Sequence, residues 1–426
     1  MQASQAIELR ALNNRGFRAV LLTLAGVPIA AAYIWRGLVE PIAFGTYLGD
    51  LQESYLRAAS QIASGFDPYD LCQTMGCLEP TGPQYVTPPL VAWMAQPLLG
   101  LDGHLVSAIV AITLNVSLAV FVFSVVRALD VTDRHLAVLL ILMAVAFEPV
   151  IGNIDEGQVN LVLLGLSGIW LWTWVDGRWW GGAALGAAIA LKLIQGPTML
   201  VVFWARRWPM LLLATVTGAA LWLIAAPQYL FEYLTKVFPE VSQGTGFYEN
   251  HSPGGTIARL FDPTTFLGAT RGSPGPARVS TLIVGVAAIL ITLWALHNPS
   301  ASRMGRALEA AVVVALAPIV ASYSWGTHLV LLLLPMFVVV VWGIRRRAWV
   351  SIALVAAGWL FIGPVHKGLQ VLLVSGYSNL VVLRVLTEMS MLGVLAIWIA
   401  CVIALRRDRL RPTAGATGTT QSRSTS

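Results

Sequence analysis

Charged side chains are scarce in this chain. Its 426 residues include 27 Lys and Arg and 21 Asp and Glu, which together make up 11% of the sequence, whereas soluble globular proteins carry about 25%. Hydrophobic residues make up 57%, and the mean hydropathy is +0.73. So few charges cannot cover a water-exposed surface, which excludes a soluble enzyme, a disordered chain and a nucleic-acid binder. The sequence therefore predicts a polytopic helical membrane protein.

Cysteine is equally rare, with three residues in the chain. Cys401 falls in the last apolar segment, whereas Cys72 and Cys77 fall close together in a polar stretch. There is no C-x-x-C pair and no His/Cys cluster of the kind that holds zinc, so we expect no metal and no cofactor. An oxidising exterior would allow Cys72 and Cys77 to form a disulfide; two unpaired thiols are the alternative.

Long apolar segments dominate the rest of the chain. A transmembrane helix needs about 20 apolar residues, and backbone groups in lipid must be satisfied within the helix. The sequence predicts an all-α fold of about twelve such helices in one domain, residues 17–405, between a cytoplasmic N-terminus (1–16) and a Ser/Thr/Gly-rich, disordered tail (406–426). The expected spans are 17–35, 86–101, 104–126, 135–150, 158–175, 181–204, 208–227, 279–296, 307–323, 326–344, 348–363 and 388–405.

Arginine is distributed unevenly between the loops. Arginines gather before the first expected span and after the sixth, eighth, tenth and twelfth, for example at Arg206, Arg303, Arg345 and Arg406. If the spans alternate, all of these positions lie on one side, which the positive-inside rule makes cytoplasmic. We therefore expect a multi-pass plasma-membrane protein with both termini cytoplasmic.

Two loops on the opposite face are unusually long, 36–85 and 228–278. Most connections in compact proteins run about 4–6 residues, and long ones are usually functional or disordered. Both loops contain aromatic residues and helix-like runs, so we interpret them as ordered segments at the membrane surface. The chemistry of the protein is therefore expected on the external face.

The first long loop carries an acid, Asp50, just beyond the outer end of the first span. A carboxylate at the membrane surface can meet a lipid-linked headgroup, and partial burial suits it to general-base work. The alternative is a structural one, in which Asp50 caps the helix that follows it.

Several polar residues occur in apolar surroundings. Lys192 lies in the middle of an expected span, where a lysine costs about 2.5–3.5 kcal/mol and is a functional candidate by default. Snorkelling to the interface, or a structural pair with Glu156, is the alternative. Three more cationic donors could converge with Lys192 on an anion, namely His251, Arg259 and His328. Other candidate site residues are Tyr55, Gln158, Asn160, Asn250 and Trp325.

Taken in order, these motifs resemble a known family. They comprise Asp50, G-x-D-P-Y at 65–69, Y-x-x-P-P at 85–89, G-Q-x-N at 157–160, A-L-K-L-x-x-x-P at 190–197, N-x-S at 250–252 followed by Arg259-Leu260, and S-W-x-x-H at 324–328. The chain is similar to the polyprenyl-phosphate-sugar-dependent membrane glycosyltransferases of family 87, in the GT-C fold class, over roughly residues 17–405. Members include mannosyltransferases and arabinofuranosyltransferases.

The resemblance implies a function and a set of site residues. Asp50 matches the family's general base, and Lys192 and His328 match its span-six lysine and late-span histidine, as ligands of the donor phosphate. Tyr55 follows Asp50 by five residues rather than four, which leaves Glu53 as a rival base. The implied reaction transfers mannose or arabinofuranose, with inversion, from a polyprenyl-phosphate donor to a cell-envelope glycan or glycolipid outside the cytoplasm. The chain has no acidic D-x-D pair, so we expect no nucleotide-sugar donor.

Two other classes of protein share some of these features. A transporter or flippase of lipid-linked sugars would also have about twelve helices, positive loops and a buried lysine. Transporters commonly show internal repeats, however, and no such repeat occurs here. A non-catalytic assembly protein with a decayed site is the third possibility.

Overall fold

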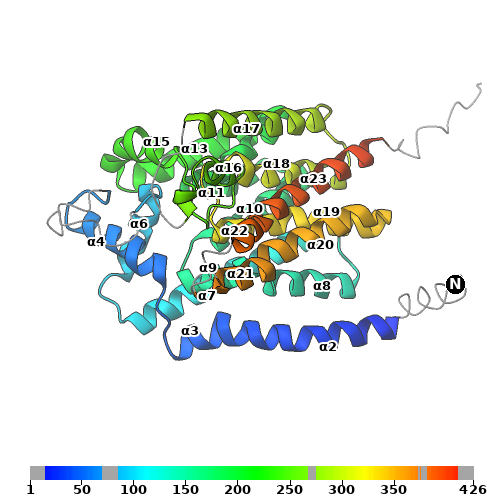
Figure 1. The fold of residues 1–426 in the computed structure, drawn as a ribbon, viewed down its shortest axis with the longest axis horizontal. Coiled ribbons are helices and arrows are strands. Elements are labelled where there is room, and N and C mark those ends of the chain that lie inside the picture. The colour runs from blue at the N-terminus through cyan, green and yellow to red at the C-terminus, as the bar shows by residue number, and fades with distance from the viewer. Residues whose placement is uncertain (1–14, 70–84, 267–274, 373–374, 376–380, 411–426) are drawn as a thin grey trace, which may run out of the picture.

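The computed structural model describes residues 15–69, 85–266, 275–372, 375 and 381–410. Within these ranges the secondary structure is helical throughout and contains no strand (Figure 1). The longer helices are α2 (Arg15–Ile34), α7 (Gly103–Ala128), α8 (Arg134–Val145), α10 (Asn160–Asp176), α13 (Trp208–Ile224), α17 (Gly275–Leu296), α18 (Arg303–Val320), α19 (Leu333–Arg346), α20 (Trp349–Leu360) and α23 (Met389–Arg409).

Shorter elements connect these helices, and the η labels mark short 3-10 or π-helical turns. They are η1 (Trp35–Val39), α3 (Glu40–Ala43), η2 (Leu51–Leu56), α4 (Arg57–Ala63), α6 (Pro89–Ala95), η3 (Gln96–Leu98), α9 (Glu148–Glu156), α11 (Gly181–Leu191), η4 (Leu193–Thr198), α12 (Met199–Trp204), η5 (Pro227–Tyr229), α14 (Leu230–Glu232), η6 (Tyr233–Val237), α15 (Phe238–Val241), α16 (Pro253–Phe261), η7 (Pro263–Phe266), η8 (Gly326–Leu332), η9 (Phe361–Val365), α21 (His366–Leu372) and α22 (Val381–Thr387).

The helices form a bundle whose centre is buried and whose periphery is apolar. Helices α18 and α19 are buried almost throughout, whereas Leu24 of α2 and Leu282 of α17 are 70% and 67% exposed. A soluble protein rarely leaves whole helix faces of this kind uncovered, but lipid covers them without cost. The chain is therefore a membrane protein.

The number of spans differs from the twelve expected. In the described part of the chain, six helices are long and apolar enough to cross a membrane, or eight if two bent pairs each count as one span. The expected span 86–101 forms only the seven-residue helix α6 and a 3-10 turn that contains Pro97, which is too short to cross about 30 Å of hydrocarbon. The expected span 135–150 is bent by 48° between α8 and α9.

The expected span 181–204 is broken into a hairpin. Helix α11 packs so closely on α13 that a side chain at Gly182 would meet the carbonyl of Met210, and one at Gly186 that of Ala214. Small residues four apart, as at Gly182 and Gly186, are typical of close helix pairs in membranes. Because the later glycine of α11 faces the later residue of α13, the two helices run parallel. Since α13 follows α12 directly, α12 must return the chain to the end where α11 began. Lys192 therefore lies at the turn of a re-entrant hairpin.

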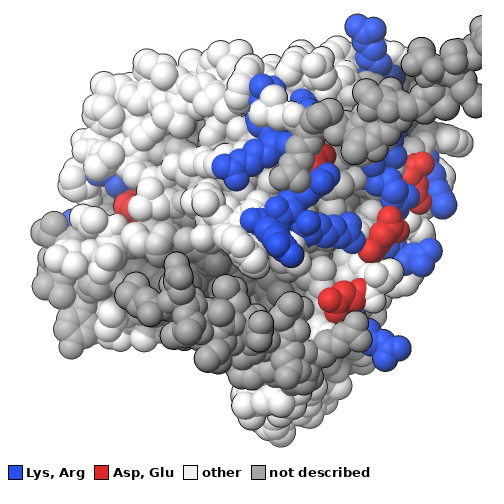
Figure 2. All heavy atoms as spheres, turned by 90° about the vertical axis from the view of Figure 1, so that its right-hand side faces the viewer, with Lys and Arg blue, Asp and Glu red and all other residues white. Residues whose placement is uncertain are grey.

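One end of the bundle collects the arginines. Arg303 pairs with Asp176 at the end of α10, Arg345 donates to the carbonyls of Leu129 and Asp130 after α7, and Arg207 donates to that of Trp174. Figure 2 shows Lys and Arg side chains gathered on this face, the right-hand side of Figure 1. The arginines assigned to one side from the sequence thus lie at one end of the structure.

Three further expectations concern the loops and termini. The helix that begins with α2 continues to Ala43, so the first long loop is shorter than residues 36–85. Helix α23 extends to Arg409, so residues 406–409 of the expected disordered tail are helical. Cys72 and Cys77 lie outside the described residues, and their disulfide stays a prediction.

Candidate active site

A large cavity lies at the end of the bundle opposite the arginines, among α9, η4, η8 and the segments that follow α4 and α15. Its volume is about 1010 Å³, at the upper end of the range of roughly 300–1,000 Å³ that small-molecule sites occupy. Among the residues that line it are Asp50, Tyr55, Gln158, Lys192, His251, Trp325 and His328. The structure thus brings together most of the site residues expected from the sequence.

Asp50 is held by the side-chain amide of Gln158. The carboxylate accepts a hydrogen bond from Gln158 Nε2 and does not cap the helical turn η2 that follows it, so the capping alternative is not what the structure shows. Gln158 reaches this position because α9 ends at Gly157 in the left-handed conformation, with φ of 65°. A side chain at Gly157 would also lie 2.7 Å from Leu51 Cβ. Glycine is therefore required both by the turn and by the close approach of the first loop.

The same amide joins Asp50 to Lys192. Gln158 Oε1 accepts hydrogen bonds from Lys192 Nζ at 2.8 Å and from Tyr55 Oη at 2.6 Å. Burial, and then the charge of Asp50, raise the pKa of Tyr55 well above its ordinary value, so its hydroxyl stays a neutral donor. The neutral amide of Gln158 thus lies between the carboxylate of Asp50 and the ammonium group of Lys192, and the two charged groups do not form a direct ion pair.

Lys192 has an extended backbone, with φ of −150° and ψ of 129°, at the break between α11 and η4. Its side chain is 7% exposed, and Nζ lies 3.2 Å from His328 Nε2. In the described part of the chain it forms no ion pair, and the alternative pairing with Glu156 does not occur: Glu156 instead accepts from the backbone N–H of Asp50, at 3.3 Å. A buried cation without an anionic partner favours the binding of an anion.

His251 and His366 form a further part of the cavity wall. Their rings meet edge to face with centroids 4.4 Å apart, and among the described residues neither His251 Nε2 nor His366 Nδ1 has a hydrogen-bond partner. Burial, and then the neighbouring His366 and Arg259, lower the pKa of His251 well below its ordinary value. His251 is therefore a neutral imidazole near pH 7 rather than a cation.

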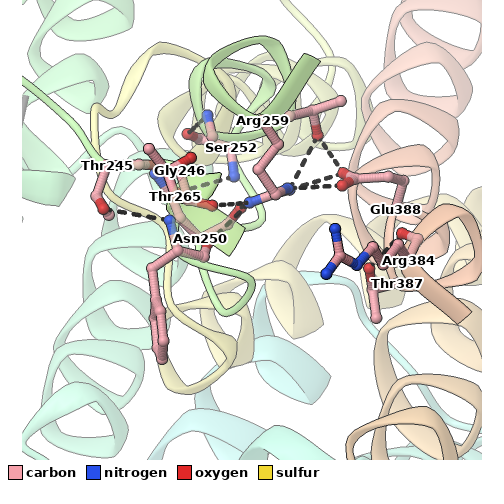
Figure 3. Close-up of polar contacts among 12 residues, drawn as sticks. Thr245, Gly246, Asn250, Ser252, Arg259, Thr265, Arg384, Thr387 and Glu388 are labelled. Atoms are coloured by element: carbon pink, nitrogen blue, oxygen red, sulfur yellow. Dashed lines mark hydrogen bonds and ion pairs between the residues drawn. The ribbon is translucent and has the colours of Figure 1, made fainter. Parts of the chain in front are cut away.

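Arg259 and Asn250 lie outside the cavity lining and form a structural cluster (Figure 3). Arg259 donates to both carboxylate oxygens of Glu388, from Nε and Nη2 at 2.7 Å each, and from Nη1 to the carbonyls of Phe247 and Asn250. All its nitrogens are therefore engaged within the protein. Asn250 donates to the carbonyls of Thr245 and Ser322 and accepts from the N–H of Ser252 and Ser324. The structure thus places both residues in the support of the loop that carries His251.

Glu53 and Asn160 also lie away from the cavity. Glu53 is exposed and accepts a hydrogen bond of 2.6 Å from Tyr47, so the rival base faces a different environment from Asp50. Asn160 is fully buried at the start of α10, and its amide has no hydrogen-bond partner in the described part of the chain. The cavity lining also includes charged or titratable residues that the sequence did not assign to the site, among them Glu148, Glu156, His366 and Lys367. Only the polar pair His366-Lys367 in an otherwise apolar stretch could have pointed to them from the sequence.

A metal site would need several ligating side chains close together. Across the described ranges, no three His, Cys, Asp or Glu side chains converge in a way that could hold a metal ion. The expectation that no metal takes part in the reaction stays a prediction.

A membrane-embedded helical bundle in which a carboxylate and a buried cation face one large cavity is suited to bind and act on a ligand. The sequence comparisons show which family of enzymes has this character. The model of glycosyltransferase family 87 matches residues 85–322, more than half of the chain. The chain belongs to glycosyltransferase family 87 and is a glycosyltransferase, as the order of its motifs predicted.

Individual relatives come from mycobacteria. The chain is 30% identical over 302 residues, 64% of its length, to a polyprenol-phosphate-mannose-dependent alpha-(1-2)-phosphatidylinositol mannoside mannosyltransferase of Mycolicibacterium smegmatis. It is 26% identical over 301 residues to the pentamannoside mannosyltransferase of that organism, and 27% identical over 245 residues to an alpha-(1->3)-arabinofuranosyltransferase of Mycobacterium tuberculosis. The matches span 66%, 68% and 54% of these relatives and 64%, 65% and 55% of this chain.

Proposed function

We propose that this protein transfers a sugar, mannose or arabinofuranose, from a polyprenyl-phosphate donor to a glycan or glycolipid of the cell envelope. The relatives' names supply the donor class, because two of them are polyprenol-phosphate-mannose-dependent. The observation that carries the proposal is the contact chain from Asp50 through Gln158 to Lys192. It holds a base and a cation on one cavity wall without letting them neutralise each other.

The reaction would be a single displacement with inversion. Asp50 takes the proton of the acceptor hydroxyl while that oxygen attacks the anomeric carbon, and the bond from this carbon to the phosphate oxygen breaks. The leaving phosphate gains negative charge, so Lys192, with His328 3.2 Å from its Nζ, stabilises the transition state more than the ground state. Gln158 fixes the orientation of Asp50 throughout. No cofactor is needed, since the donor brings its own activated bond.

The cavity would open toward the external face of the plasma membrane. The arginine-bearing end of the bundle is then cytoplasmic by the positive-inside rule, and the first and last described helices, α2 and α23, begin and end there (Figure 1). Alternation of the twelve spans expected from the sequence puts residues 155–160 on the cytoplasmic side, because it counts 86–101 as a span. Without that span, the end of α9 lies on the same side as Asp50, as the contact between Gln158 and Asp50 requires.

Transfer by purified protein tests the proposal. The protein in lipid nanodiscs is incubated with radiolabelled polyprenyl-phosphate mannose, or the arabinofuranose donor, and mannoside or arabinan acceptors; we expect labelled product from the wild type and none from Asp50→Asn. A flippase would move the labelled lipid across proteoliposomes without forming product. That result, or equal product from Asp50→Asn, would contradict the proposed function.

A further inference from the structure

One face of α9 follows the wall of the cavity. Glu148, Gly152 and Glu156 all line it, and because they are four residues apart they lie in one row along the helix. Eight residues of helix span about 12 Å, so the Cα atoms of Glu148 and Glu156 are separated by roughly the length of two linked pyranose rings. Gly152 has no side chain in the middle of the row, and a Cβ built there would lie 3.9 Å from Thr327 Cγ2 and from both carboxylate oxygens of Glu148, so the Glu148 carboxylate lies beside this glycine.

The two carboxylates have capacity to accept further hydrogen bonds. Glu156 Oε2 accepts from the N–H of Asp50, and Glu148 Oε1 lies 3.3 Å from Lys367 Nζ. Lys367 is 45% exposed and Glu148 23%, so this pair is partly hydrated. Each carboxylate offers about four lone-pair sites, so both can accept further hydrogen bonds from a ligand beside the row.

An independent observation on the histidine wall also indicates a ligand. His251 is 1% exposed, it lines the same cavity, and its Nε2 has no partner in the described structure. A buried polar atom without a partner costs free energy unless a ligand or water satisfies it. Gly326 keeps the wall open at this point, because even a Cβ there would lie 3.8 Å from His251 Nε2 and 4.0 Å from His366 Nε2.

We propose that the α9 row of Glu148, Gly152 and Glu156 binds the uncharged sugar of the acceptor, with His251 Nε2 as a further contact from the histidine wall of the same cavity. Sugar hydroxyls donate well to carboxylates, whereas a phosphate beside two carboxylates would be repelled. The acceptor headgroup is thus a neutral glycan of about two rings, and any phosphate it carries lies outside the row.

Position along the cavity assigns the row to the acceptor rather than to the donor sugar. Asp50 is linked to both regions: its carboxylate accepts from Gln158, which contacts Lys192, and its backbone N–H donates to Glu156. If the donor phosphate binds at Lys192, as the proposed function on which this inference rests requires, the acceptor hydroxyl must reach Asp50 from the side of Glu156. The row then extends away from the reacting atoms toward Lys367.

Equilibrium binding tests the row without depending on transfer. Titration calorimetry of the protein in nanodiscs with methyl mannobioside, a soluble neutral disaccharide, should show binding that weakens about tenfold in Glu148→Gln, as expected for loss of a charge-assisted hydrogen bond. The matched control is Asp155→Asn on the same helix, because Asp155 pairs with Arg36 outside the cavity, and it should bind like the wild type. The 6-phosphate of the same disaccharide should bind more weakly than the neutral one.

Transfer kinetics then show whether the row binds the sugar of the acceptor or the sugar of the donor. Glu148→Gln and Gly152→Leu, which adds a bulky apolar side chain beside the Glu148 carboxylate, should raise the acceptor KM and leave the donor KM unchanged. A rise in the donor KM alone would assign the row to the donor sugar and overturn the proposal. So would wild-type protein that binds no neutral disaccharide, or unchanged binding in both variants. If binding behaves as expected but no donor supports transfer, the proposed function fails and the sugar-binding row stands.

Discussion

Lys192 and Arg259 are two buried cations, each 7% exposed, in a chain with few charges, yet their surroundings differ. Arg259 meets a carboxylate through two hydrogen bonds and fills its remaining donors with loop carbonyls (Figure 3). Lys192 meets a neutral amide and an imidazole and forms no ion pair with the described residues. A compensated cation stabilises the fold, whereas an uncompensated one is completed by a ligand. Burial alone therefore does not identify a functional cation; the partner does.

The largest expected effect concerns the base that Lys192 faces across Gln158. Asp50→Asn removes basicity and keeps the shape of the side chain, so turnover should fall by about 10²–10⁴-fold while donor binding and the unfolding temperature stay close to wild type. Single-turnover transfer and thermal unfolding in nanodiscs measure the two properties. Retention of more than about a third of the activity would exclude Asp50 as the general base.

Exchanging the two cations for apolar residues tests the comparison directly. Arg259→Leu leaves Glu388 unpaired and should lower the free energy of unfolding by about 3 kcal/mol. Lys192→Met removes an uncompensated charge, so the protein should be as stable as the wild type or more so. Its donor KM should rise, and its kcat should fall if the contact tightens on the leaving phosphate. His328→Ala should raise the donor KM alone.

The opposite outcome would reverse the two roles. If Lys192→Met unfolds readily while Arg259→Leu is stable and binds the donor poorly, then Arg259 is the phosphate ligand. Arg259→Lys serves as a control, because it keeps the charge but loses the two-pronged contact with Glu388.

A smaller effect is expected in the pH dependence of stability. The lowered pKa of His251 means that below pH 6.5, about the ordinary value for histidine, the unfolded chain binds a proton that the folded chain does not. Stability should therefore fall as the pH drops through about 6.5, with a slope near 1.4 kcal/mol per pH unit for one proton. Unfolding temperatures between pH 8 and pH 5 measure the slope, and His251→Asn should flatten it. An unchanged slope in that variant would mean that other groups set the pH dependence.

The smallest effect is expected at Glu53, the rival of Asp50. Its carboxylate is exposed and contacts Tyr47 rather than the cavity. Glu53→Gln should therefore keep transfer within about twofold of wild type, since exposed polar contacts contribute little. A loss as large as that of Asp50→Asn would make Glu53 the base.

The sequence alone determined the membrane class, the helical fold and the family, and it named Asp50, Lys192 and His328 as candidates, because composition, hydropathy and the order of motifs can be read along the chain. It could not separate Lys192 from Arg259, since both are basic residues in apolar or loop surroundings. It counted 86–101 and 181–204 as simple spans, because hydropathy does not register a helix that stops early or turns back. Only the tertiary structure decided which side chains face the cavity together. Residues 50, 158, 192 and 328 meet there because elements far apart in the chain pack against each other.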